Sequence, residues 1–554
     1  MLRCIETRLL MGNEAIALGA LRAGLHIACG YPGTPSSEIL ETVAREISSS
    51  PLAGEVGWGA NKPYCEWSVN EKAAAETAAG AAIAGARVLV TMKQMGLNVA
   101  ADPVMSINYV GIKGAMVIVV ADDPGPISSQ TEQDTRHFAE FAHIPVFDPS
   151  SPEEAYTMME EAFALSEKLG RPVIVRPTTR VSHSYSSVQM LPAIEGLPVK
   201  GWTKDNGKWV IFPRASYLNH IKIVEQEREL SHAEAQRRGV AVSRKGIATG
   251  GVSYTYVQEA LKNTNEEYRL LKINQYPINE NLVLDFLEGL DEVLVVEELD
   301  PVIEDNLFRI CGKHHVSITI HGKHDKTVPA AGELSTDILI KTLCASAPPR
   351  ELILPPLPPR PPVLCQGCPH HDSFTAVKDA VAEMGLADDA VYSGDIGCYT
   401  LGNTLGVTDT CLCMGAGITQ AAGIHRAEKI RDANSKMVNF AFIGDSTFFA
   451  SGVSGVINAV YNGADEIICV LDNSTTAMTG GQEHPGMGRT LMGKTVEKIS
   501  IANIVKGCGV DHVETVNCRK HDEAVAVVKK MITKTGVRVI IFEGACVTYF
   551  GGKK

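Results

Sequence analysis

The chain has 554 residues, a formal net charge of −13 and a hydrophobic content of 45%. This composition is typical of a well-packed protein of two to four domains, and the lack of a basic block argues against nucleic acid as a partner. No uninterrupted apolar run approaches the ~20 residues that span a bilayer, so we expect no membrane segment, a cytoplasmic protein, and cysteines that serve as ligands, core residues or redox groups.

The first block, residues 1–190, alternates helix-like and strand-like segments, which predicts an α/β domain with a parallel sheet. We expect a helix at Glu14–Gly24 with a cap near Asn13, and a second helix in the Ala-rich stretch Glu71–Ala84. The expected strands are His26–Gly30, Arg87–Met92 and Ala115–Ala121.

Two features of this block carry chemical information. The run GYPGTPSS, from Gly30 to Ser37, predicts an extended turn with a helix N-cap at Ser36 or Ser37. Glu71 opens a helix of small residues that can pack closely on a neighbour. Composition alone favours a first-turn glutamate stabilised by the helix dipole. The alternative is a carboxylate held in an apolar pocket for proton transfer.

The middle of the chain contains a connector, a smaller domain and a linker. Residues 191–244 are polar and then become helical and charged over Val224–Arg238, which is typical of a connector. Residues 245–346 restart the βα pattern, with a buried strand at Glu292–Glu297. Residues 347–363 are so rich in proline that they exclude a helix and predict a linker.

The last block, residues 364–554, contains the most informative stretch of the chain. An apolar run over 438–443 stops at Gly444-Asp445-Ser446, a helical segment follows over 450–462, and a second apolar run over 467–471 stops at Asp472-Asn473. Strand, helix, strand predicts a right-handed parallel unit. Asp445 and Asn473 then sit at the carboxyl ends of neighbouring strands, where open parallel sheets bind ligands.

The residue types at this edge suit a diphosphate. Carboxylate, amide and carbonyl oxygens are ligands for a Mg²⁺ ion that holds phosphate groups. Just upstream, the glycine-rich run 414–417, which includes Gly415, predicts a helix that opens under the same phosphates. An ordinary nucleotide-type βαβ turn is the alternative.

Four cysteines of the last block are candidate ligands. Cys365 and Cys368 form a C-x-x-C pair, Cys398 ends SGDIGC, and Cys546 ends VRVIIFEGAC. A C-x-x-C pair alone is compatible with half a zinc site, a redox pair or two core thiols. Four thiolates at the ends of neighbouring strands would suit a [4Fe–4S] cluster or a tetrahedral zinc ion.

Together these motifs resemble the 2-oxoacid:ferredoxin oxidoreductases, and among them the large (alpha) subunits of the indolepyruvate type. The resemblance runs over nearly the whole chain, through MGNEAIALGAL, GYPGTPSSE, EWSVNEKAA, TMKQMGLNVAADP, SSQTEQDTR, VLVVEELDPVIE, LCQGCPHH, GDIGCYTLG and CMGAGI. It implies an α/β fold with two thiamine-diphosphate-binding-type parallel-sheet domains. Residues 1–190 would bind the pyrimidine and residues 364–554 the diphosphate, with a transketolase-C-terminal-like domain at 245–346 between them.

The resemblance also implies roles for individual residues. Thr34 would lie beside the reactive thiazolium and Glu71 against the pyrimidine, with Gly33, Gly96 and Asn98 lining the same cavity, the last two in a glycine-containing turn. The GDG…N signature of thiamine-diphosphate enzymes maps to Gly444, Asp445, Ser446, Asn473 and Thr475. Asp445, Asn473 and the carbonyl of Thr475 would hold Mg²⁺, and Cys365, Cys368, Cys398 and Cys546 would hold one [4Fe–4S] cluster.

The implied reaction is the oxidative decarboxylation of an arylpyruvate to an arylacetyl-CoA, with coenzyme A as co-substrate and electrons passing through the cluster to ferredoxin. Arg136, in the loop 128–137, is a candidate clamp for the substrate carboxylate, and His484 is a second candidate substrate residue. Relatives carry a ferredoxin-like tail with further cysteine runs, and no such run follows Cys546. We therefore expect a smaller gamma/beta-type subunit and a ferredoxin or ferredoxin-like subunit as partners, in a dimer of heteromers.

Two other functions stay open. A non-redox thiamine-dependent 2-oxoacid decarboxylase would need Glu71 and the metal residues but not the four cysteines. A non-catalytic cofactor-binding subunit would need neither proton transfer nor a redox group.

Overall fold

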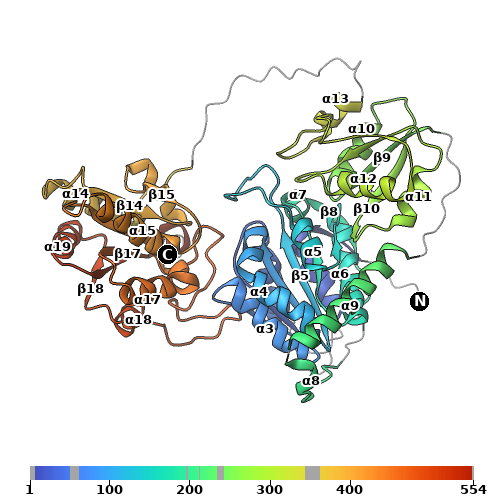
Figure 1. The fold of residues 1–554 in the computed structure, drawn as a ribbon. Helices are drawn as coiled ribbons and strands as arrows, with labels where there is room; N and C mark the ends of the chain where they lie inside the picture. The colour runs from blue at the N-terminus through green and yellow to red at the C-terminus, as the bar shows by residue number, and fades with distance from the viewer. Residues whose placement is uncertain are drawn as a thin grey trace. The chain divides into compact units, whose positions relative to one another are not determined.

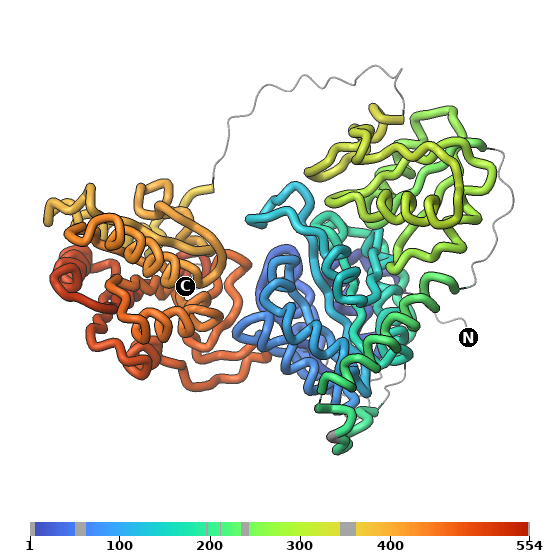
Figure 2. Tube along the Cα trace, in the orientation of Figure 1, coloured from blue at the N-terminus to red at the C-terminus, as the bar shows by residue number. Residues whose placement is uncertain are grey.

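The computed structural model describes residues 6–49, 62–194, 198–210, 212–233, 243–343 and 362–551. The chain forms two compact units, residues 1–352 and 353–554 (Figure 1). The division falls inside the segment that the sequence predicts as a proline-rich linker, most of which lies outside the described residues. Figure 2 traces the first unit from blue to yellow and the second from orange to red.

Unit 1 is built on a seven-stranded sheet with the order β11-β6-β7-β5-β4-β2-β3. Its strands are β2 (Ile27–Gly30), β3 (Tyr64–Trp67), β4 (Arg87–Lys93), β5 (Ala115–Ala121), β6 (Val146–Phe147), β7 (Val173–Val175) and β11 (Gln275–Tyr276). All pairs are parallel except β11 with β6. The predicted parallel α/β sheet is confirmed, and β11 adds to it a strand from the smaller domain.

The helices of this block are α1 (Gly12–Arg22), α2 (Ser37–Ser49), α3 (Glu71–Ile83), α4 (Gln94–Val110), α5 (Thr135–Ala142), α6 (Pro152–Leu169) and α7 (Thr179–His183). Strand β1 (Thr7–Met11) pairs antiparallel with β8 (Tyr185–Gln189). The prediction that α1 is capped near Asn13 is wrong. Asn13 is fully buried within the helix, and its Nδ2 atom donates to the carbonyl of Pro35 at 2.7 Å. Its amide therefore fixes the turn that follows β2.

The connector contains α8 (Asn206–Trp209) and α9 (Pro213–Ser231). The predicted helix Val224–Arg238 is wrong at its start, because proline at the first helical position begins α9 at residue 213 and polar residues hide its first two turns from a periodicity search. Residues 234–238 of that prediction lie outside the described residues.

The smaller domain of unit 1 is a four-stranded parallel sheet with helices on both faces. Its strands, in the order β10-β9-β12-β13, are Arg269–Ile273, Lys245–Gly250, Glu292–Val296 and Thr319–His321. Its helices are α10 (Ser253–Leu261), α11 (Glu280–Leu287), α12 (Val302–His314) and α13 (Thr336–Leu343). Along β9, Ile247 packs in the cluster of α10 and α13, and Ala248 packs in the cluster of α11 and α12, as expected for a strand buried on both faces.

Unit 2 is a six-stranded parallel sheet with the order β15-β14-β16-β17-β19-β18. The strands are β14 (Ala390–Gly394), β15 (Thr410–Cys411), β16 (Val438–Gly444), β17 (Glu466–Asp472), β18 (His512–Asn517) and β19 (Val537–Glu543). The helices are α14 (Pro369–Glu383), α15 (Ala416–Arg431), α16 (Asp445–Thr447), α17 (Val453–Tyr461), α18 (Ile501–Gly507), α19 (His521–Ile532) and α20 (Val547–Phe550).

The alternation of side chains along β16 places helices on both faces of this sheet. Phe440 and Phe442 pack with α14 and α19, while Ala441 and Ile443 pack with α15, α17 and α18. The helix predicted at 450–462 begins earlier, because α16 starts at Asp445 and a π-helical turn over Phe448–Gly452 leads directly into α17. In the part of the chain that the structure describes, no helix combines the length and apolar character of a membrane span.

Candidate active site

The carboxyl ends of β16 and β17 carry the predicted metal residues of unit 2. The two strands are neighbours, and Gly444 is in register with Leu471. Asp445 and Asn473 follow immediately and are buried, with 2% and 6% of their surfaces exposed. The backbone N–H of Ser474 donates to Asp445 Oδ2 at 2.8 Å. The structure thus brings together the two residues that the sequence places 28 positions apart.

The donor set at this edge fits a hard divalent cation. The Asp445 carboxylate, the Asn473 amide oxygen and the backbone of Thr475 lie at one strand end, where the N–H of Thr475 donates to Asn473 Oδ1 at 3.1 Å. Burial and, after it, the negative charge of Asp445 together raise the pKa of Asp472 to about 7. Two carboxylates in one buried place are an excess of negative charge that Mg²⁺ would neutralise.

Ser446 and His484 complete this edge. The Oγ of Ser446 accepts a hydrogen bond from the Thr476 hydroxyl at 2.8 Å. His484 Nε2 lies 3.1 Å from Asp445 Oδ2, off the line of a hydrogen bond, and its ring rests on Phe449. Burial would raise the pKa of Asp445, but the contact with His484 holds it below its usual range. A substrate role for His484 stays a prediction.

A buried histidine, His370, lies at the same edge. His370 Nε2 lies 3.2 Å from the Nδ2 atom of Asn473, and the His370 ring stands edge-on to Tyr399. Burial lowers the pKa of His370 to about 4, against the opposing charge of Asp445. The imidazole is therefore neutral at pH 7 and accepts the amide proton of Asn473. Its neighbour His371 is exposed.

The glycine-rich entry to α15 is held by a carboxylate that sequence reasoning missed. Asp395 is fully buried; it accepts the N–H of Gly415 at 3.1 Å and the hydroxyl of Tyr399. Burial raises the pKa of Asp395 to about 7 despite these bonds. Gly415 has φ +84°, and a Cβ at Gly444 would lie 2.6 Å from the Tyr399 ring. The motif SGDIGC contains Asp395, but the sequence analysis assigned a role only to its last residue, Cys398.

The four predicted cluster cysteines lie near one another in unit 2. Burial and, to a smaller extent, the charges of Cys368, Cys546 and Cys365 together raise the pKa of the Cys398 thiol to about 12. Cys368 precedes α14, whose first backbone N–H groups bond to its sulfur and oppose the rise in its own pKa. The N–H of Cys546 donates to the carbonyl of Asn473 at 3.0 Å.

A thiolate-bound cluster at these four cysteines stays a prediction. Cys365, Cys368 and Cys546 each lie close enough to Cys398 for their charges to raise its pKa, and one backbone bond joins Cys546 to a predicted magnesium ligand. Among the described residues, no three or more His, Cys, Asp and Glu side chains are grouped so that they could hold a single metal ion.

In unit 1, the turn after β2 is locked by its own side chains. The N–H of Gly33 donates to Ser37 Oγ at 3.0 Å, and Ser36 Oγ donates to the carbonyl of Gly33 at 2.8 Å. Asn13 holds Pro35 from below, and Ser128 Oγ donates to the carbonyl of Thr34 at 3.3 Å. Thr34 itself is half-buried. The turn therefore presents Thr34 in a fixed position.

Glu71 begins α3, and Asn70 caps that helix through its side-chain oxygen. Glu71 retains partial exposure, yet burial of its carboxylate raises the pKa to about 7, and the charge of Lys93 lowers it only in part. A Cβ at Gly96 would lie 2.7 Å from Cγ and Oε1 of Glu71. Gly96 thus leaves the space that the Glu71 side chain fills.

Replacing Gly96 with Ala should lower activity without lowering stability. The added methyl group must displace the end of the Glu71 side chain, which is flexible, while alanine favours the helix by about 1 kcal/mol. We expect a loss of turnover of about tenfold and an unchanged or higher melting temperature. Gly80→Ala in α3, where a Cβ meets nothing within 4 Å, is the matched control. A Gly96→Ala protein with full activity would contradict the packing argument.

One predicted detail of this region is wrong, and another stays a prediction. The segment KQMGLN is not a turn, because β4 ends at Lys93 and α4 begins at Gln94, so that Gly96 lies in the first helical turn. Asn98 is exposed, and its Nδ2 atom donates to Gln133 Oε1 at 3.0 Å. The structure places Gly96 against Glu71, and the role of Asn98 at a cofactor stays a prediction.

The prediction for Arg136 is also corrected. It lies in α5 and not in a loop, is 3% exposed, and bonds through Nε and Nη2 to Asp134 and through Nη1 to Glu297 at 2.7 Å. The carbonyls of Glu298 and Asp300 accept further bonds. Every nitrogen of the guanidinium is engaged by protein groups, so Arg136 has no donor left to clamp a substrate.

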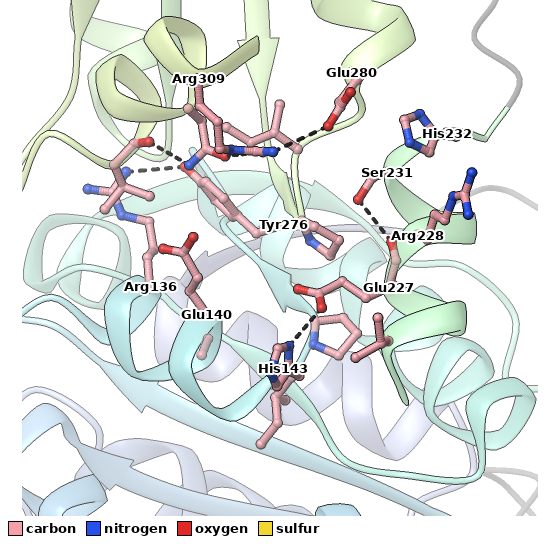
Figure 3. A pocket seen from close by; sticks show the side chains of 18 of the residues that line it. Arg136, Glu140, His143, Glu227, Arg228, Ser231, His232, Tyr276, Glu280 and Arg309 are labelled. Atoms are coloured by element: carbon pink, nitrogen blue, oxygen red, sulfur yellow. Dashed lines mark hydrogen bonds and ion pairs between the residues drawn. The ribbon is translucent and has the colours of Figure 1, made fainter. Parts of the chain in front are cut away.

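Arg136 instead lines a cavity of about 510 Å³ between α5, α9 and the smaller domain (Figure 3). Neither Thr34 nor Glu71 lines this cavity. In it, Arg309 bonds to Glu280 and His143 bonds to Glu227. Glu280 and Glu227 thus have cationic partners within the cavity lining, and the cavity is not the one that the sequence predicted.

Substituting Arg136 with Met should destabilise unit 1 rather than impair substrate binding. It leaves Glu297 as a buried charge without its cation and Asp134 with only the more distant Arg176, and breaking a buried ion pair in this way costs about 3–5 kcal/mol. Urea unfolding measures the loss. Arg228→Met, at an exposed position lining the same cavity, is the control. A higher KM with unchanged stability would restore Arg136 as the clamp.

Comparison with known proteins finds a thiamine-binding family in each of the two parts of the chain described above. Residues 18–205 match the family described as "Pyruvate flavodoxin/ferredoxin oxidoreductase, thiamine diP-bdg", and residues 395–542 match "Thiamine pyrophosphate enzyme, C-terminal TPP binding domain". The chain is 40% identical to the indolepyruvate oxidoreductase subunit IorA of Methanothermobacter thermautotrophicus, over 98% of this chain and 87% of that protein. It is also 40% identical to the subunit of that name from Archaeoglobus fulgidus, over 98% and 86%.

Among solved structures, a 2-oxoglutarate:ferredoxin oxidoreductase from Magnetococcus marinus aligns with 61% of this chain and 65% of that chain, at a TM-score of 0.48 and 16% identity. That likeness is too distant to add to the argument. The two matched domains and the full-length relatives are sufficient, and the chain belongs to the 2-oxoacid:ferredoxin oxidoreductase family, among the subunits of the IorA type.

Proposed function

We propose that this chain catalyses the oxidative decarboxylation of an arylpyruvate, an indolepyruvate-like 2-oxoacid, to an arylacetyl-CoA. In the balanced reaction, the 2-oxoacid, coenzyme A and two oxidised ferredoxins give the acyl-CoA, CO₂, two reduced ferredoxins and a proton. The bond between the carboxylate and the 2-oxo carbon breaks, and a thioester bond forms at that carbon. The two electrons of the broken bond pass one at a time to the two ferredoxins.

The observation that carries this proposal is the hydrogen bond from Cys546 N–H to the carbonyl of Asn473, at 3.0 Å. It joins Cys546, one of three cysteines whose charges act on Cys398, to the strand end whose oxygen atoms would hold a metal-bound diphosphate. A non-redox decarboxylase has no use for thiols at this position. An electron acceptor beside the organic cofactor is what the oxidative reaction requires.

Thiamine diphosphate would supply a carbon nucleophile and an electron sink. Asp445, Asn473 and the carbonyl of Thr475 would hold its Mg²⁺, and the α15 N-terminus at Gly415 would face the phosphates. Glu71 would hold a proton at the pyrimidine N1′, and a carboxyl whose pKa is about 7 can both give and take that proton near neutral pH. Thr34, held by the locked turn, would contact the substrate.

We propose a smaller gamma/beta-type subunit and a ferredoxin or ferredoxin-like subunit as partners in a dimer of heteromers. The support is the resemblance to relatives that are named as subunits. Co-expression with a candidate small subunit, followed by light scattering, tests the assembly. A chain that remains a monomer in that mixture would contradict it.

The activity test is an anaerobic assay of the reconstituted protein with indolepyruvate, coenzyme A and ferredoxin. We expect arylacetyl-CoA and CO₂ in equal amounts and two reduced ferredoxins for each. Release of an arylacetaldehyde with no ferredoxin reduction would favour the non-redox decarboxylase. Bound thiamine diphosphate without conversion of any 2-oxoacid would favour the non-catalytic subunit.

A further inference from the structure

All donors of Arg136 are hydrogen-bonded to protein groups, so a different cation must bind the carboxylate of the substrate. A candidate cation is Lys93, which lies at the carboxyl end of β4 and at the N-cap of α4. A Cβ placed at Gly33 would meet its Cγ at 3.3 Å and its Cδ at 3.4 Å. Its charge also lowers the pKa of Glu71. Lys93 therefore lies beside the turn that carries Thr34 and within electrostatic reach of Glu71.

One residue connects Lys93 to Thr34 directly. The Nζ atom of Lys93 donates to the carbonyl of Ser128 at 3.1 Å, and the hydroxyl of Ser128 donates to the carbonyl of Thr34 at 3.3 Å. The N–H of the same serine donates to Asp123 at 2.9 Å. Ser128 thus holds the lysine ammonium and the Thr34 backbone on one short bridge.

The ammonium still has capacity for a ligand. It carries three N–H donors, of which one is engaged by Ser128. In the part of the chain that the structure describes, no carboxylate lies within 4.0 Å of Nζ. Asp123 is the acid with the largest effect on Lys93, but its oxygens accept from Ser128, Ser129 and Thr179. Burial lowers the pKa of Lys93, and Asp123 and Glu71 oppose that shift.

We propose that Lys93 binds the carboxylate of the 2-oxoacid substrate and so places the 2-oxo carbon beside Thr34. This inference rests on the proposed function, because it assigns one contact of that substrate. A half-buried lysine with two free donors suits a single carboxylate as a point charge. The contact exists from binding until the carboxylate leaves as CO₂, so its loss raises KM more than it lowers kcat.

The test compares two ligands and three variants of the holoenzyme. The ligands are 3-(indol-3-yl)propionate and its amide, which share shape and differ in charge, and calorimetry measures their affinities without turnover. Lys93→Met removes the charge, Lys93→Arg keeps it, and Lys168→Met, at an exposed position at the end of α6, is the control. Melting temperature and thiamine diphosphate binding report whether each variant is folded.

We expect the unsubstituted protein to bind the acid more tightly than the amide by about 10- to 100-fold, the range for hydrogen bonds to charged groups. Lys93→Met should abolish that preference and leave the amide affinity unchanged, while Lys93→Arg retains most of it. With indolepyruvate, KM of Lys93→Met should rise by a similar factor while kcat changes less than about threefold.

Two outcomes would overturn the assignment. If Lys93→Met keeps the preference for the acid, the carboxylate binds elsewhere. If kcat falls while KM and the acid preference stay, Lys93 acts only through the proton affinity of Glu71. Failure of the proposed function would be visible earlier, as an unsubstituted holoenzyme that neither converts nor binds any 2-oxoacid.

Discussion

Replacing Glu71 with Gln should lower kcat by about 10²- to 10⁴-fold, the usual contribution of a positioned acid–base group. Gln fills the same space against Gly96 but cannot exchange a proton with the pyrimidine. Thiamine diphosphate binding, measured by quenching of protein fluorescence, should change less than about tenfold. The control is Glu76→Gln on the exposed side of α3, where Glu76 pairs with Lys72. Unchanged turnover in Glu71→Gln would remove this residue from the mechanism.

The same substitution predicts a pH effect on the protein without cofactor. The pKa of Glu71 is raised from an ordinary 4.5 to about 7 because the fold disfavours the charged carboxylate. The folded state therefore retains a proton that the unfolded state releases, so stability falls as pH rises from about 4.5 to about 7 and then levels off. Glu71→Gln removes this loss, and its melting temperature should exceed that of the parent at pH 8 but not at pH 4. Equal shifts at both values would contradict the assignment.

The fold and the strand-end half of the site follow from short-range signals. Buried strands such as β5 and β16 are continuous apolar runs, and a strand–helix–strand unit fixes its own handedness and the edge at which it presents polar residues. Asp445 and Asn473 are therefore predictable, since each directly follows a strand whose partner is next along the chain.

The residues that sequence reasoning misjudged depend on contacts between distant segments. Arg136 resembles a free loop arginine in the sequence, and its partner Glu297 lies 161 positions away in another domain. Lys93 stands in the motif KQMGLN, of which the sequence analysis assigned roles only to Gly96 and Asn98. Its position is fixed by a hydrogen bond to the carbonyl of Ser128, 35 positions away. Ion pairs over such separations leave no periodic pattern in the sequence. Only the folded structure distinguishes a cation that is already paired from one that can bind a ligand.

Asp395 illustrates a third kind of limit. Tyr399 donates to it from only four positions away, but its function as a buried acceptor for Gly415 requires a segment 20 positions away to return to the end of β14. A carboxylate that fixes a helix N-terminus looks the same in sequence as one that binds a metal. The structure separates Asp395 from Asp445 by their partners.

Substituting Cys398 with Ser should remove the iron–sulfur cluster and with it the oxidative half of the reaction. The pKa of the Cys398 thiol is influenced by all three other candidate ligands, so its substitution removes the thiolate that would lie near all the others. We expect iron per chain to fall from about four to near zero and the broad visible absorbance to vanish. Acyl-CoA formation should then fall below detection, while thiamine diphosphate still binds.

Decarboxylation distinguishes this outcome from simple unfolding. Without an electron acceptor, the Cys398→Ser protein should still release CO₂ from indolepyruvate slowly, with arylacetaldehyde as product, because Glu71 and the oxygen ligands at β16 and β17 are untouched. Cys508→Ser, a half-buried position outside the group of four, should keep its iron and its acyl-CoA yield. Full iron in Cys398→Ser would remove Cys398 from the ligand set. One zinc per chain in the parent protein would replace the cluster with a structural metal, and the enzyme would then have no internal route for the two electrons.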